Sequence, residues 1–213
     1  MKLHTPILLA AALAFALPAL APAATPPAAE TCVPTKVADT KAALRDLWIG
    51  HVFWVRNVVA ARFAGNASQA KAAEQQVVAN AQAIAGAIEP YYGKAASDQL
   101  FKLLAGHWGA ISSYLDATRA GKKADQDAAY KALVDNAGQI ATFLSGANPY
   151  LPVDTLRGLL LAHGGHHVQQ IQEFQAKQYD QEAKTWAAIT GHMYVIADAL
   201  AGGIAQQFPD KFR

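Results

Sequence analysis

The sequence predicts an all-α fold, an up-and-down bundle of six helices made of three helical hairpins of about 56 residues each. Three observations predict it. No segment shows the apolar–polar alternation of a strand. From Asp39 onward the chain is rich in Ala, Leu, Gln and Lys, and its apolar residues recur every three or four positions, as on one face of a helix. The pattern also returns at a fixed offset along the chain.

The N-terminal region is expected to be a targeting segment rather than part of the fold. Residues 1–24 resemble a secretory signal peptide, because Lys2 precedes an apolar run over 7–20 and small residues offer a cleavage site near 21–24. The protein is therefore predicted to be exported, and periplasmic if the cell has two membranes. Residues 25–38 are Pro-rich and predict an arm, which leaves 39–213 as the bundle domain.

The chain contains one cysteine, Cys32, so it cannot form a disulfide within itself. In an oxidising compartment an unpaired cysteine can join two copies of a chain, remain a free thiol or act as a ligand. A homodimer through Cys32 is therefore possible, and the role of this residue stays open.

Composition excludes some classes of partner. The formal net charge is +2 and no long basic run occurs, which argues against nucleic acid. No stretch after the leader reaches 18 consecutive apolar residues, so we expect no stable membrane insertion of the mature chain.

Glycine, proline and polar stretches divide the remaining sequence into helices. The interruptions are Gly65-Asn66, 90–93, Gly121, 146–152 and 178–180. They predict six helices near residues 40–64, 67–89, 97–119, 123–144, 153–177 and 181–207.

A histidine recurs every 56 residues in the first helix of each predicted hairpin, at His51, His107 and His163. In the second helix of each hairpin, Asn80, Asn136 and His192 share one phase at the same spacing. Each of these six positions is about 14 residues from its hairpin turn, or roughly 21 Å along a helix. They are therefore expected to form one layer of the bundle, and the apolar stripes around the histidines turn them inward.

A layer of buried histidines predicts a transition-metal site. Buried imidazoles need partners, and several close together cannot all be protonated, whereas neutral imidazole is a common metal ligand. The predicted ligands are His51, His107, His163 and His192, with His167 added because it lies one helical turn from His163. Asn80 and Asn136 are expected to orient the imidazoles opposite them by accepting a ring N–H. His166 has no assigned role.

The identity of the metal is not fixed by the sequence. A site of three or four imidazoles suits copper, zinc, nickel or iron, and we favour copper or zinc. The predicted function is metal handling or sensing in the cell envelope. Two alternatives stay open: a metal-free structural or interaction module with a hydrogen-bonded His/Asn core, and a metalloenzyme with an open coordination position.

One segment resembles the opening of a known family. Leu47, Trp48, His51, Trp54 and Arg56 form an LWxxHxxWxR pattern that is similar to the start of an uncharacterised family of small, helical, secreted bacterial proteins. The similarity extends over most of the mature chain, with later matches at 103–107 and 147–149. No activity is established for that family, so the resemblance implies an all-helical fold and recurring histidines at 51 and 107, and no function.

Overall fold

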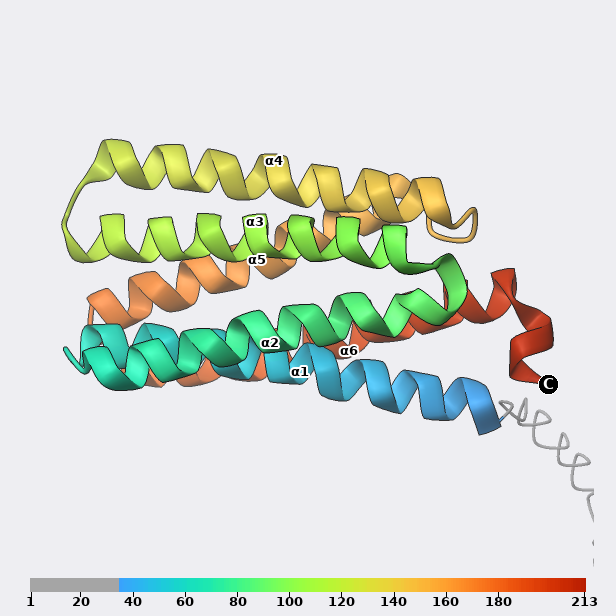
Figure 1. Cartoon of the computed structure of the whole chain (residues 1–213). Coiled ribbons are helices and arrows are strands. Elements are labelled where there is room, and N and C mark those ends of the chain that lie inside the picture. The colour runs from blue at the N-terminus through green and yellow to red at the C-terminus, as the bar shows by residue number, and fades with distance from the viewer. Residues whose placement is uncertain (1–34) are drawn as a thin grey trace, which may run out of the picture. The chain divides into compact units, whose positions relative to one another are not determined.

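A computed structural model describes residues 35–213, which form six long helices and one short 3-10 helix, without any strand in that range. The predicted all-α helical bundle is confirmed (Figure 1). The elements are α1 (Thr35–Phe63), α2 (Ala67–Tyr92), α3 (Lys94–Arg119), α4 (Lys123–Ala147), α5 (Val153–Gln175), α6 (Tyr179–Gln207) and η1 (Pro209–Phe212).

Consecutive helices pack side by side, and α6 returns to pack against α1, so that the six helices close a ring. Across this ring α5 also contacts α1 and α3. The three odd-numbered helices therefore meet in the interior of the bundle. This arrangement allows side chains from α1, α3 and α5 to approach one another although they are far apart in the sequence.

Two helix boundaries differ from the prediction. Helix α1 already includes Thr35, the first described residue, whereas the predicted helix begins near residue 40. Helix α2 continues past Pro90 to Tyr92, because a proline in the last turn costs one backbone hydrogen bond without ending the helix. The chain turns at Gly93, whose φ of 80° favours glycine and whose N–H donates to the Glu89 carbonyl at 2.8 Å.

The predicted signal peptide, its cleavage site and Cys32 all lie outside the described residues. They remain predictions from the sequence.

The core consists of two apolar clusters. One contains Trp48, Leu104 and Leu160, and the other contains Val55, Ile111 and Ile171. In α1, α3 and α5 alike, a buried histidine lies between the residue that belongs to the first cluster and the residue that belongs to the second. A polar layer therefore separates the two apolar parts of the core.

Helix α6 is long and apolar enough to span a membrane, as judged by length and composition alone. It packs between α1 and α5 and buries one face, including Ile189, Met193 and Ala197. These contacts are those of a core helix in the bundle.

Two ion pairs fasten α6 to α1. Arg45 binds Asp198 through two hydrogen bonds of 2.8 and 2.6 Å. Arg56 binds Glu182 through two hydrogen bonds of 2.6 Å, and its guanidinium lies 5.1 Å from the ring of Trp186. The first and last long helices are thus joined at two levels.

Candidate metal centre

Helix α1 supplies His51 to the interior. Trp48, Val52 and Val55 lie on the same face and are buried, so the helical repeat places the His51 ring among them. The ring meets the Trp48 indole edge-on, with centroids 6.2 Å apart.

Helix α5 supplies two further histidines from adjacent turns. His163 and His167 are each 1% exposed, and their ring centroids lie 4.6 Å apart in an edge-on arrangement. The two glycines between them do not interrupt the helix. A Cβ atom on Gly164 would lie 3.3 Å from the Leu133 side chain, so the missing side chain lets α4 pack closely beside this pair.

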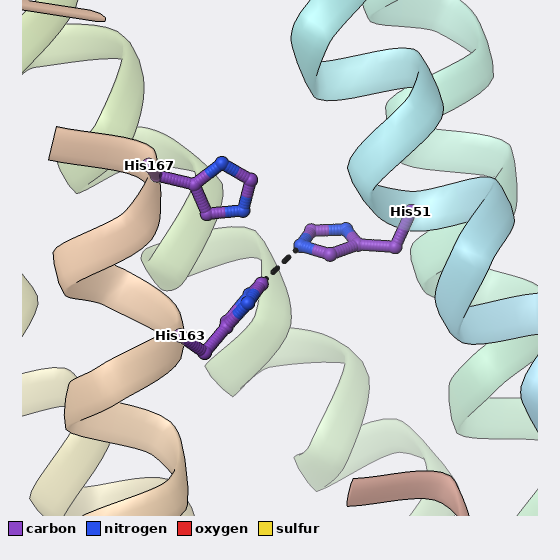
Figure 2. Close-up of side chains that lie close together, drawn as sticks. All are labelled: His51, His163 and His167. Atoms are coloured by element: carbon purple, nitrogen blue, oxygen red, sulfur yellow. Dashed lines mark hydrogen bonds between the residues drawn. The ribbon is translucent and has the colours of Figure 1, made fainter. Parts of the chain in front are cut away.

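His51, His163 and His167 together form a site that could hold a metal ion (Figure 2). Each offers one ring nitrogen, and these three nitrogens lie within 4.8 Å of one another. The Nε2 atoms of His51 and His163 are 3.3 Å apart. A tetrahedral ion with metal–nitrogen bonds of about 2.0 Å holds its ligand nitrogens roughly 3.3 Å apart. The spacing of these two nitrogens thus suits a shared ion, and a ring nitrogen of His167 lies within 4.8 Å of a ring nitrogen on each of His51 and His163.

Burial keeps the imidazoles neutral. The pKa of His51 falls to about 3, mainly because burial disfavours the charged ring and further because His107 lies near. Burial lowers the pKa of His107 to about 4, against an opposing effect of its hydrogen bond with Asn136. The pKa values of His163 and His167 lie well below the usual 6.5 for the same main reason, with the neighbouring histidines adding to it. Neutral imidazole is the form that binds metals.

Several buried nitrogen atoms of these imidazole rings also lack a hydrogen-bond partner. Among the residues the structure describes, no hydrogen-bond partner is found for Nε2 of His107, for Nδ1 of His163 or for either nitrogen of His167. A buried polar atom without a partner costs free energy, and a bound cation would satisfy lone pairs of this kind. The donor set therefore fits a transition-metal ion.

His107 lies next to the three histidines but outside their group. Its ring is stacked on that of His163, with centroids 5.3 Å apart and planes inclined by 16°, and lies 6.2 Å from the His51 ring. Its Nδ1 is 3.2 Å from Oδ1 of Asn136, so Asn136 contacts an imidazole as the sequence analysis expected.

The structure places His192 and Asn80 away from the group. His192 is half-buried, and its Nε2 donates to the carbonyl of Leu159 at 2.8 Å, so this nitrogen is not free for a metal. Asn80 donates to the carbonyl of Leu47 at 2.9 Å, and its Oδ1 has no partner in the described part of the chain. His192 thus takes the position of an asparagine rather than that of a ligand.

These contacts form a series. The side chains of Asn80, Asn136 and His192 each donate to the carbonyl of the residue 33 positions earlier, at 2.9, 3.0 and 2.8 Å. The donors are spaced by 56 residues, as are the acceptors Leu47, Leu103 and Leu159. This regularity agrees with the predicted hairpin repeat, which remains a prediction.

His166 faces away from the centre and pairs with His192. Their ring centroids lie 5.6 Å apart, and both rings are half-buried. Burial, followed by the proximity of His192, lowers the pKa of His166. The pair lies between α5 and α6, apart from the three buried ligands.

Sequence reasoning missed a buried polar network that lies C-terminal to the histidines of α5. Gln170 is 1% exposed and donates to Oε1 of Glu182 at 2.8 Å, which links it to Arg56. Glu173 is also buried, and its Oε1 accepts from Thr185 at 3.0 Å and from Gln169 at 2.9 Å. The helical phase of Gln170, three residues after His167, was the available signal.

Comparison with known proteins adds no relative. No family model matches the chain, and neither a curated protein nor a solved structure is significantly similar to it.

Proposed function

We propose that this protein binds a transition-metal ion, with copper or zinc favoured, through His51, His163 and His167, and that it handles or senses this metal in the cell envelope. One observation carries the proposal: three neutral imidazoles from two helices gather with their nitrogens within 4.8 Å of one another. Imidazole ligands suit copper and zinc, and nickel and iron are the other ions compatible with this donor set.

The architecture supports binding inside a formed fold. The histidines lie between two apolar clusters, which bury the rings inside the bundle. His51 and His163 are separated by 112 residues, so the complete ligand set exists only after the bundle has formed.

The test is metal analysis of the mature protein, purified without a histidine tag. We expect bound copper or zinc, or saturable binding when the ion is titrated into the metal-free protein. Binding to the native state alone should also raise the unfolding temperature, since a hundredfold excess over Kd adds about 2.7 kcal/mol of stability. Chelation should reverse the increase.

The absence of binding for copper, zinc, nickel and iron would contradict the proposal. It would favour a metal-free module, in which the Asn80 and Asn136 bonds to the preceding helices and the His107–Asn136 contact hold the bundle together.

Export is the second part of the proposal, and it is supported by the apolar run after Lys2 and the small residues near 21–24. Cell fractionation followed by N-terminal sequencing tests it. We expect a mature chain in the envelope fraction that begins shortly after residue 21. An intact N-terminus on cytoplasmic protein would contradict export without affecting metal binding.

A further inference from the structure

The side chain of Asn136 fixes which nitrogen of His107 carries the proton. Nδ2 of Asn136 donates to the Leu103 carbonyl at 3.0 Å, and a carbonyl can only accept. The amide oxygen of Asn136 must therefore face Nδ1 of His107, at 3.2 Å. Because this oxygen also can only accept, the proton resides on Nδ1 and the lone pair of the ring is on Nε2.

The lone pair on Nε2 of His107 has no protein partner. This atom is buried and lacks a hydrogen-bond partner within residues 35–213. The ring lies beside the three histidines, with its centroid 5.3 Å from that of His163. A fixed, unused acceptor is therefore held at the edge of the proposed metal site.

The orientation of His107 does not suit a fourth ligand. Imidazole lone pairs lie in the ring plane, and the rings of His107 and His163 are stacked with an angle of 16° between their planes. Two stacked rings direct their lone pairs along nearly parallel planes rather than toward one ion. His51 and His163, whose planes are inclined by 52°, do converge, with 3.3 Å between their Nε2 atoms.

We infer that Nε2 of His107 accepts a hydrogen bond from a small protic ligand, such as water, hydroxide or hydroperoxide, that occupies a metal position left open by the other three histidines. This inference rests on the proposed function. Three imidazole ligands leave a tetrahedral ion one further position, and an O–H group bound there can donate to a nearby lone pair. The centre is then an open site that exchanges a small oxygen ligand, and not a closed structural or storage site.

The experiment uses the mature protein loaded with Cu(II) as the spectroscopic probe. Pulsed electron paramagnetic resonance counts the coordinated imidazoles, and exchange into D₂O reveals a copper-bound ligand with exchangeable protons. We expect three imidazoles and an exchangeable ligand in the wild-type protein. The His107→Leu variant should keep three imidazoles and a similar copper affinity, while the deuteron coupling of the bound ligand changes.

Asn80 and Asn136 provide a matched pair of variants. Both donate to a carbonyl of the preceding helix at nearly the same distance, 2.9 and 3.0 Å, and only Asn136 contacts an imidazole. Asn136→Ala removes the amide oxygen that keeps the proton on Nδ1 of His107, so it should alter the deuteron coupling of the bound ligand. Asn80→Ala should leave this coupling unchanged. Equal spectra for the two variants would count against the inference.

The outcomes distinguish the inference from the function on which it rests. Four coordinated imidazoles in the wild-type protein, falling to three in His107→Leu, would make His107 a ligand and overturn the inference while metal binding stands. Wild-type protein with three imidazoles and no exchangeable ligand would also overturn it. A protein that binds no copper or other transition metal would overturn the proposed function itself.

Discussion

His163 is the histidine on which the proposed site depends most. Its Nε2 lies 3.3 Å from that of His51, and its ring centroid lies 5.3 Å from that of His107 and 4.6 Å from that of His167. We predict that His163→Ala weakens metal binding more than about tenfold, the range in which loss of a metal-site residue is felt. His166→Ala is the matched control, and isothermal titration measures both. Equal losses would mean that the ligands are assigned incorrectly.

Burial of neutral histidines makes the metal-free fold sensitive to acid. The pKa values of His51 and His107 fall from 6.5 to about 3 and about 4, so below pH 6.5 the unfolded chain binds more protons than the native one. Stability is full above pH 6.5 and is lost as the pH falls toward the native pKa values. Each such histidine contributes about 1.4 kcal/mol per pH unit once the unfolded form is protonated.

Urea unfolding between pH 7 and pH 5 measures this loss above the range in which carboxylates titrate. We expect the midpoint to fall steadily with pH in the wild-type protein and less steeply in His167→Leu, which removes one buried imidazole. A midpoint independent of pH in this window would contradict the assigned protonation states.

At the scale of single residues, the sequence predicted some positions of the candidate site and not others. The 56-residue spacing and the apolar stripes identified His51, His107 and His163 as inward-facing residues. Helical phase also added His167, one turn from His163, but it could not show that the His192 ring turns to the Leu159 carbonyl and away from the group. Side-chain rotamers and the tilt of neighbouring helices decide this, and they depend on tertiary packing.

Two glycines in α3 test how closely the helices of a hairpin must approach. A Cβ atom on Gly106 would lie 3.2 Å from Nδ2 of Asn136, whereas one on Gly109 would meet no atom within 4 Å. The Asn136 side chain is held by one hydrogen bond through Nδ2 and one through Oδ1. Gly109→Ala should therefore stabilise the protein by about 0.5–1 kcal/mol through helix propensity.

Gly106→Ala should lack this gain or destabilise the protein, because Asn136 must move from the Leu103 carbonyl. Thermal unfolding of the two variants against the wild type measures the difference. An equal gain for both would show that Asn136 yields freely and that its hydrogen bonds do not fix the position of His107.

The element boundaries show what local signals can predict. Turns built on glycines with positive φ, at Gly65 and Gly121, lie where the sequence placed them. The residues 35–39 were not predicted to be helical, but they belong to α1, because this short segment after the prolines carries no strong helix-start signal.

The closed ring of helices depends on the contact between α1 and α6. Glu182 is 3% exposed and its partner Arg56 is 37% exposed, whereas in the Arg45–Asp198 pair the side chains are 43% and 32% exposed. Removing Arg56 leaves the buried Glu182 carboxylate without its counter-charge, which costs more than losing an exposed pair, whose contribution is up to about 1 kcal/mol.

We therefore predict that Arg56→Ala destabilises the whole bundle far more than Arg45→Ala does. Denaturant unfolding of the two variants gives the comparison. Similar, small losses in both would indicate that Glu182 is accommodated by Gln170 and by water without the guanidinium.

For the whole molecule, periodicity in the sequence was sufficient to predict an all-helical bundle, since apolar spacing and turn residues agree along the chain. The pairing of Arg56 with Glu182 could not be predicted. The two residues are 126 positions apart in the sequence, and no local pattern encodes how their helices are rotated relative to each other.

The distance along the chain between His51 and His163 has a consequence for the order of maturation. His163 and His167 are four residues apart and come together when α5 forms, whereas gathering His51 as well requires closing a segment of 112 residues at an entropic cost. For the proposed site we therefore expect folding to come first and metal binding second. The newly made polypeptide would fold without the ion and bind it afterwards, at a site that is already formed.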